Sequence, residues 1–249
     1  MVDKIKKFVP KLLRKPFSKV YFYSIFLKDY FTFKKLSKNR FLVIWKNRYP
    51  QLFDKTPTTH FDTHYIYHPA WAVRIVKKIN PKFHIDIAST LNFTAILSAF
   101  IPVKYYDYRP ANLILDNFTS GKADLRNLPF KDSSVDSISC MHTVEHVGLG
   151  RYGDPIEPDG DLRAISELKR ILAPGGSLLF VVPIGRARVM FNAHRIYSYE
   201  QIMSYFKDLK LEEFSLIPDN AEMVGMISNA TKELADKQKY GCGCFWFKK

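Results

Sequence analysis

Residues 83–185 constrain the fold of this chain more than any other part of the sequence, because they repeat a strand, a turn and a helix. The first unit is an apolar strand over 83–87, a turn of small residues over 88–90 and an apolar helix over 92–100. Strands that alternate with helices in this way predict a parallel α/β sheet. In such a sheet, ligands bind in the crevice at the carboxyl ends of the strands.

Acidic residues stand where the next two strands end. The second strand, over 103–106, ends at Asp107, which lies nineteen residues after Ala88. This spacing is about where nucleotide-binding folds place the carboxylate that receives ribose hydroxyls. A further short strand is closed by Asp124, before a Leu-Pro-Phe turn. The pattern therefore predicts a nucleotide site edged by carboxylates, although an aspartate at a strand end is also an ordinary turn or cap residue.

The remaining elements continue the same rhythm. Alternating or continuous apolar patterns predict further strands over 134–141, 177–183, 211–217 and 240–247. Turn and capping residues predict helices over 70–79, over 162–172 with Asp161 as its cap and 173–176 as its end, and from Ser198 onward. We expect a Rossmann-like α/β sheet that is mostly parallel and has an antiparallel C-terminal strand.

The charge is concentrated at the amino end. Residues 1–50 hold fourteen Lys and Arg against two acidic residues, which is +12 of the total net charge of +14. The remainder is close to neutral, and its composition is ordinary for a globular protein. We therefore expect two parts: a basic helical extension over 1–56 and a Rossmann-like domain over 57–249.

The basic extension favours an anionic partner. Ile5, Phe8, Val9, Leu12 and Leu13 fall on one helical face with lysines around it, although Pro10 would kink such a helix. Contact with an anionic membrane surface and packing as a cap on the domain are both open, while nucleic acid is disfavoured by the near-neutral domain. No apolar run reaches the length of a membrane span, and three irregular cysteines indicate a reducing compartment. We expect a cytoplasmic protein that lies peripherally at the inner face of the membrane, or free of it.

No metal site is expected. His60, His64 and His68 are spaced four apart, which would align three imidazoles on a helix. Pro69 argues against that helix, because proline suits the first turn of a helix that starts after His68. The acidic loop over 148–161 does not have the spacing of a calcium loop.

Several ordered motifs carry a family resemblance: residues 124–130, 136–140, 145–147 and 168–176. Together they resemble the class I S-adenosylmethionine-dependent methyltransferases. The segment 140–155 resembles more narrowly a family of bacteria and nematodes known as domain of unknown function 268, in a match over about 63–215. For the bacterial relatives, this resemblance implies enzymes of surface-polysaccharide synthesis.

The resemblance implies a set of residues that bind S-adenosyl-L-methionine. They are Asp86, Ala88 and Ser89 in the first motif, Asp107 at the ribose, Asp124 and Leu125 at the adenine, and Met141 near the methyl group. One departure is that the first loop lacks glycine, which elsewhere removes a colliding Cβ and allows positive φ. A weakened or lost cofactor site is therefore an alternative.

Other residues are candidates for catalysis and for binding the acceptor. The bases nearest the expected methyl position are His142, Glu145 and His146, and we favour His142 as the base with Glu145 orienting it. The acceptor candidates are Tyr152, Asp154, Arg186, Arg188, His194 and Arg195. Arginines on a solvated loop are the simpler alternative.

We therefore predict an enzyme that uses S-adenosyl-L-methionine to methylate a sugar hydroxyl during polysaccharide synthesis. Its acceptor would be a small molecule or a nucleotide-linked sugar. A degenerate member that acts as a binding or scaffold partner and an RNA methyltransferase are the two alternatives.

Overall fold

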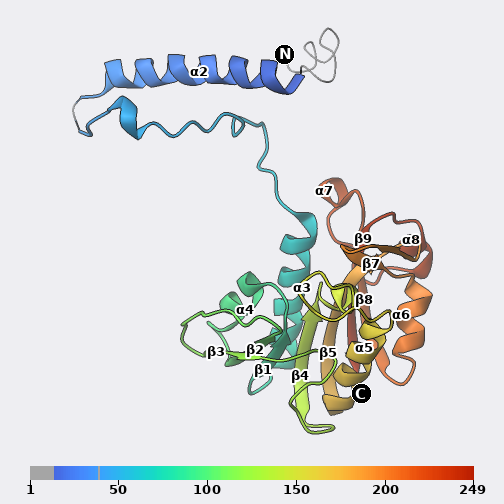
Figure 1. The fold of residues 1–249 in the computed structure, drawn as a ribbon. Helices are drawn as coiled ribbons and strands as arrows, with labels where there is room; N and C mark the ends of the chain where they lie inside the picture. Colours follow the sequence, from blue (N-terminus) through green and yellow to red (C-terminus); the bar gives the residue numbers. More distant parts are fainter. Residues whose placement is uncertain (1–13, 39) are drawn as a thin grey trace. The chain divides into compact units, whose positions relative to one another are not determined.

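The computed structural model describes residues 14–38 and 40–249, and the chain divides into two compact units, Met1–His60 and Phe61–Lys249 (Figure 1). Each unit is described by itself. No helix in the described ranges is both long and apolar enough to cross a membrane.

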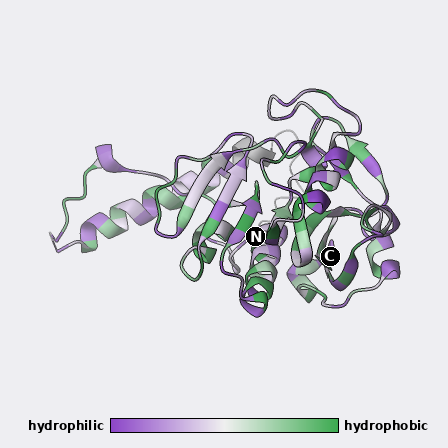
Figure 2. Cartoon of the chain, turned by 90° about the horizontal axis from the view of Figure 1, so that it is seen from below, coloured by the Kyte–Doolittle hydropathy of each residue, from purple (hydrophilic) through white to green (hydrophobic). Residues whose placement is uncertain are grey.

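The first unit is built on aromatic contacts. Helix α2 spans Arg14–Leu36, and a short 3₁₀ helix, η1, spans Trp45–Asn47. The ring of Tyr30 meets the ring of Trp45 edge to face at 5.1 Å between centroids. Hydrophobic and hydrophilic residues follow one another along α2 without separating into two faces (Figure 2). The predicted apolar face over 5–13 lies outside the described residues.

The second unit contains a sheet of seven strands in the order β3-β2-β1-β4-β5-β9-β8 (Figure 1). Its strands are β1 (His84–Ile87), β2 (Val103–Asp107), β3 (Phe118–Lys122), β4 (Val135–Met141), β5 (Leu172–Ile184), β8 (Lys210–Ile217) and β9 (Gly241–Lys248). The first five pair in parallel, and β9 pairs antiparallel with β5 and β8. The predicted fold class is thus confirmed, and the strand order reverses between β1 and β4.

Helices cover both faces of this sheet. The larger elements are α3 (Thr63–Ile79), α4 (Leu91–Leu97), α5 (Gly160–Ile171) and α6 (Tyr199–Tyr205). The smaller ones are η2 (Val144–His146), α7 (Ala221–Val224), α8 (Lys232–Asp236) and the hairpin of β6 (Arg188–Met190) with β7 (His194–Ile196). α3 and α4 pack on one face, and α5, α6 and α8 pack on the other. The sheet therefore lies between two helical layers and is buried on both faces.

Three expectations about these elements are wrong. The helix predicted to start after His68 begins earlier, at Thr63, because Asp62 caps it by accepting from the Tyr65 amide. Pro69 therefore lies inside α3, in its second turn. β3 ends at Lys122, before the position expected to close that strand, and its polar, half-exposed sequence gives only a weak strand pattern.

The third concerns α5 and β5. α5 begins at Gly160, so Asp161 lies inside its first turn. The residues expected to close α5, 173–176, belong to β5, because the strand already pairs at Leu172 with Val135 before a register shift.

Candidate functional site

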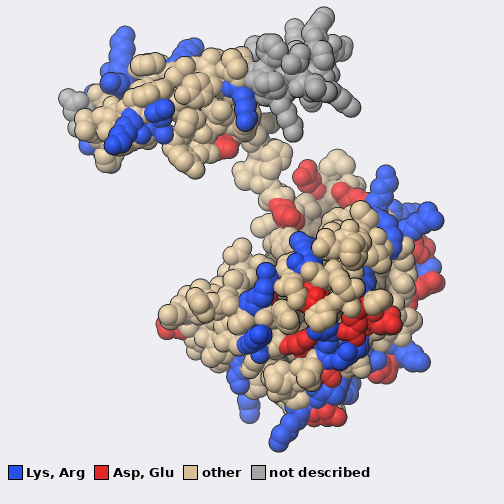
Figure 3. Space-filling view, in the orientation of Figure 1, with Lys and Arg blue, Asp and Glu red and all other residues tan. Residues whose placement is uncertain are grey.

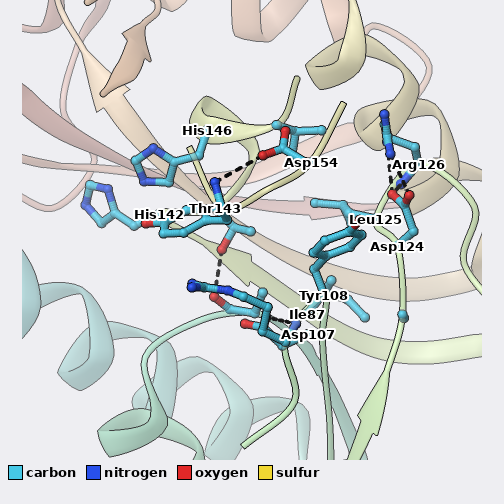
Figure 4. Close-up of a pocket in the computed structure, with 15 residues that line it drawn as sticks. Ile87, Asp107, Tyr108, Asp124, Leu125, Arg126, His142, Thr143, His146 and Asp154 are labelled. Carbon is cyan, nitrogen blue, oxygen red and sulfur yellow. Dashed lines mark hydrogen bonds and ion pairs between the residues drawn. The ribbon is translucent and has the colours of Figure 1, made fainter. Parts of the chain in front are cut away.

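Two adjoining hollows open at the carboxyl ends of β1, β2 and β4, where the strand order reverses. The first is lined by Ile87, Ala88, Asp107, Tyr108, Arg109, Ala123, Asp124, Leu125, Arg126, His142, Thr143, His146, Val147, Tyr152 and Asp154. Figure 4 shows Asp124 and Arg126 on one side of this hollow and the two histidines on the opposite side. The second hollow shares Ala88, His142, His146 and Tyr152, and adds Tyr65, Ser89, Thr90, Met141, Glu145, Arg151, Ala193, His194 and Tyr240. This position is where open α/β sheets bind ligands.

The loop after β1 takes a left-handed turn without glycine. Ala88 adopts φ +55°, the conformation that glycine usually supplies, and its carbonyl accepts from Thr143 Oγ1 at 2.8 Å. The next residue, Ser89, accepts at Oγ from the backbone amide of Met141. The loop after β1 is therefore tied to the loop after β4 on both sides of the crevice.

Asp86 holds this loop from below and does not line either hollow. It is fully buried, accepts from the Ser89 amide at Oδ1, and contacts Ser139 Oγ through Oδ2. Burial raises the pKa of Asp86 to about 7 despite these hydrogen bonds. Asp86 is predicted to contact the cofactor, but in the structure it supports the turn over 88–90 from beneath.

Asp107 lies at the end of β2 with its carboxylate half-exposed in the first hollow. Oδ2 accepts from Tyr105 Oη at 2.9 Å, and Oδ1 accepts from the Arg109 amide at 2.7 Å. A carboxylate offers about four lone-pair positions, so two of them remain for hydroxyl donors.

Arg126 takes up part of the hydrogen-bonding capacity of the Asp124 carboxylate. Arg126 donates to it through Nε, Nη2 and its backbone amide at 2.7–3.0 Å, and the same guanidinium reaches Glu157. The hydrogen bonds from Arg126 hold the pKa of Asp124 below its usual value. Its side chain is still 35% exposed, so Oδ2 can accept one more donor beside the apolar Leu125.

His142 and Glu145 form a buried pair. His142 Nδ1 lies 2.9 Å from Glu145 Oε1, as the sequence predicts for their spacing. Burial lowers the pKa of His142, but Cys242 and Glu145 raise it more strongly, so its pKa lies above the usual value. Burial likewise raises the pKa of Glu145, yet the bond to His142 outweighs burial and leaves it lowered. Nε2 of His142 is closed to solvent, so an acceptor in either hollow does not reach it in this structure.

His146 is the better placed base. Its Nδ1 lies 2.6 Å from the Ala193 carbonyl, which requires that Nδ1 carry the proton and leaves the lone pair on Nε2, 3.8 Å from Glu145 Oε1. Burial lowers the pKa of His146, so the neutral imidazole predominates at neutral pH. It lines both hollows, between the carboxylate side and the aromatic side.

The predicted acceptor residues separate into two groups. Tyr152 and His194 line the second hollow, and Asp154 lines the first while accepting from the Gly148 amide at 2.7 Å. Arg195, by contrast, is buried and donates to the carbonyls of Val147 and Pro158, so it holds the loop together.

Arg186 and Arg188 are exposed, and Arg188 donates to the Arg186 and Lys239 carbonyls. These bonds explain their position without an acceptor, and neither arginine lines the two hollows.

Sequence reasoning missed several lining residues. Thr143 and Arg151 lie in the recognised segment 140–155 but were not chosen as site residues. Tyr240 comes from a segment without a motif of its own, more than forty residues beyond the second hollow's other members. Tyr65 stands in a stretch rich in aromatics and histidines ahead of β1, and this composition is the signal that could have found it.

The fold of residues 61–249 is that of the class I S-adenosylmethionine-dependent methyltransferases. A putative sarcosine dimethylglycine methyltransferase from Galdieria sulphuraria is 12% identical, with a TM-score of 0.50 over 73% of this chain and 84% of that one. The N-methyltransferase NodS from Bradyrhizobium japonicum, solved in complex with S-adenosyl-L-homocysteine, is 14% identical, with a TM-score of 0.50 over 73% and 85%. At these identities the likeness concerns the fold alone.

Residues 126–238 match the family described as Caenorhabditis protein of unknown function, DUF268, which confirms the narrower resemblance predicted from the sequence. An uncharacterized protein of Methanocaldococcus jannaschii is 28% identical over 102 residues, or 40% of this chain. The chain spans about two fifths (39%) of the length of that curated relative.

Proposed function

We propose that this protein is a methyltransferase that uses S-adenosyl-L-methionine to methylate a hydroxyl group of a nucleotide-linked or other small sugar. The observation that carries the proposal is that Asp107, at the end of β2, and Asp124, just after β3, line the same hollow (Figure 4). Had these carboxylates lain at opposite ends of the sheet, no adenosine could contact both.

The donor set of the first hollow fits the cofactor. Asp107 has two open acceptor positions for the two ribose hydroxyls, and Asp124 has one for the exocyclic amine of adenine. Leu125 supplies an apolar surface for the ring. The tight turn at Ala88 already has the backbone conformation that glycine would give, at the cost of one Cβ.

The second hollow suits a polar acceptor. When bound, the cofactor supplies an electrophilic methyl group on a sulfonium. The chain must then hold a hydroxyl in line with that group and remove its proton. His146 lines this hollow, and its Nε2 lone pair would take that proton, while Tyr152, His194 and Tyr240 provide the aromatic and hydrogen-bonding walls that a sugar needs. The place in polysaccharide synthesis is supported by the family resemblance, not by the geometry.

Calorimetric titration of the full chain with S-adenosyl-L-methionine and with S-adenosyl-L-homocysteine tests the proposal. We expect both to bind and Asp107→Asn to weaken binding about 10- to 100-fold, because a charged acceptor of two hydroxyls is lost. Asp116→Asn is the matched control, since Asp116 is exposed on the loop before β3. Failure of the folded wild type to bind either compound would favour the degenerate binding protein instead.

The first unit supports an additional role as a membrane-surface anchor. Its described part exposes Phe31, Phe33, Leu36, Phe41 and Leu42 among lysines and arginines, with few acidic side chains between them (Figure 3). Exposed aromatics insert at the lipid interface, and each basic residue adds about 1 kcal/mol near an anionic surface.

Vesicle sedimentation tests this role. The full chain should pellet with phosphatidylserine vesicles but not with phosphatidylcholine vesicles, and a Phe31→Ser/Phe33→Ser variant should pellet less. Phe100→Ser removes an equally exposed phenylalanine from the second unit and should have no effect. Equal sedimentation with both lipids would contradict the anchor.

A further inference from the structure

Three side chains with metal-binding atoms converge beneath the second hollow. They are His64 on α3, His142 directly after β4, and Cys242 on β9, and their ligand atoms all lie within 4.8 Å of one another. Their exposures are 9%, 8% and 0%. Positions 64, 142 and 242 are far apart in the chain, so only the fold brings this set together.

A buried nitrogen in the cluster has no partner. His142 Nδ1 is engaged by Glu145, and its Nε2 is fully buried without a hydrogen bond of normal geometry from the described residues, although the Cys242 thiol lies close enough to influence the ring. Nε2 of His68 is likewise buried without a hydrogen bond from the described residues, while its Nδ1 contacts the His64 carbonyl. The ring centroids of His68 and His142 lie 5.2 Å apart. Buried polar atoms are normally paired, so an orphaned nitrogen calls for a missing ligand.

We propose that His64, His142 and Cys242 bind a divalent transition-metal ion of the zinc class. Imidazole and thiolate are the ligands that zinc prefers, at about 2.0–2.3 Å. Two imidazoles on one tetrahedral ion have ring centroids about 5 Å apart. The rings of His64 and His142 lie 5.3 Å apart.

The surroundings complete the site. Glu145 accepts from Nδ1 of His142, the nitrogen that would face away from the ion, as a carboxylate commonly does for a metal-bound histidine. Binding draws the three ligand atoms together by about 1 Å, to the spacing of a tetrahedral ion. The thiol proton of Cys242 and the Nε2 proton of His142 pass to solvent, and no electron is transferred.

Two tyrosines separate the cluster from solvent. Tyr65 stacks on His142 and Tyr240 stacks on His64, at 5.4 and 5.2 Å between centroids. Their exposures are 47% and 41%, so rotation of one ring opens a path for the ion. Three protein ligands leave a fourth position for water. The site goes beyond the proposed function, since neither the cofactor hollow's carboxylates nor His146 takes part.

Cobalt titration tests the proposal on the full chain, freed of any histidine tag and stripped with a chelator. We expect one Co²⁺ to bind per chain and to show the near-ultraviolet charge-transfer absorption of a thiolate ligand, which Zn²⁺ then abolishes by displacement. Cys242→Ser should remove this absorption, and His64→Gln should weaken binding at least about tenfold.

Cys140→Ala is the matched control, because Cys140 is an equally buried free thiol packed in the core on the other side of the sheet. It should leave the cobalt spectrum unchanged. Should the variants fail to fold, the wild type alone decides: Zn²⁺ must raise its melting temperature after chelation. Cobalt binding without thiolate absorption, retention of that absorption in Cys242→Ser, or no effect of zinc on wild-type melting would overturn the proposal. None of these readouts requires binding of S-adenosyl-L-methionine.

Discussion

Replacing Asp86 by asparagine should change how the stability of this protein depends on pH. The carboxyl of Asp86 is fully buried beneath the Ala88 turn, and burial raises its pKa from 3.8 to about 7. Between these values the folded chain holds a proton that the unfolded chain has released. The free energy of unfolding of the wild type therefore falls as pH rises through this window.

The magnitude follows from the shift. Each unit of pKa corresponds to about 1.4 kcal/mol, so the carboxyl of Asp86 costs the wild type about 4 kcal/mol across the window. The amide of Asp86→Asn imitates the protonated carboxyl: its oxygen accepts from the Ser89 amide and its NH₂ faces Ser139. It does not titrate, so the variant lacks this loss.

Urea unfolding at about pH 4.5 and about pH 8 measures the effect. The free energy of unfolding of Asp86→Asn, minus that of the wild type, should rise by about 3 to 4 kcal/mol between the two conditions. Other titrating groups cancel in this difference. Asp136→Asn is the control, because Asp136 is exposed on the neighbouring strand β4. A difference for Asp86→Asn that stays constant with pH would refute the assignment of a buried, protonated carboxyl.

Three further outcomes are expected. Ala88→Gly should raise the free energy of unfolding by roughly 0.5–1 kcal/mol, because glycine adopts φ +55° without strain. It should also strengthen cofactor binding measured by calorimetry, because a Cβ beside the ligand is removed. Ala123→Gly, the control, should lower the free energy of unfolding. His146→Gln should reduce methyl transfer from labelled cofactor to a panel of nucleotide sugars about 10²- to 10⁴-fold and abolish the acid limb of the pH profile, which should lie below the usual histidine pKa. Arg195→Ala should lower the urea-unfolding free energy by about 3 kcal/mol, since it leaves the buried carboxylate of Asp161 without its ion pair and two part-buried carbonyls without a donor. Unchanged stability would contradict this structural role of Arg195.

The fold class and the carboxylates of the first hollow could be predicted because they depend on local patterns. An apolar run ending in an aspartate places Asp107 at the end of β2, and Asp124 follows two residues after β3, which pairs in parallel with β2 and so ends at the same edge. Whether a given carboxylate faces the crevice depends on strand register. Asp86 lies before the end of β1, so its side chain turns into the layer beneath the loop.

The histidine arrangement could not be predicted, because it depends on contacts between distant segments. The sequence pattern predicts a helix that starts at Pro69, yet the cap at Asp62 begins α3 earlier and aligns His64 with His68. Cys242 reaches them only because β9 enters the sheet antiparallel beside β5. A single sequence carries no pattern for such a meeting.

Two hydrogen bonds across the crevice couple the loops after β1 and β4. Thr143 donates to the Ala88 carbonyl and the Met141 amide donates to the Ser89 hydroxyl, so movement of one loop requires movement of the other. An ion bound to His142 would restrict the loop after β4. Through these two hydrogen bonds it would restrict the loop after β1 as well. Slower hydrogen exchange at the Ser89 and Met141 amides should then appear together, as a single cooperative response.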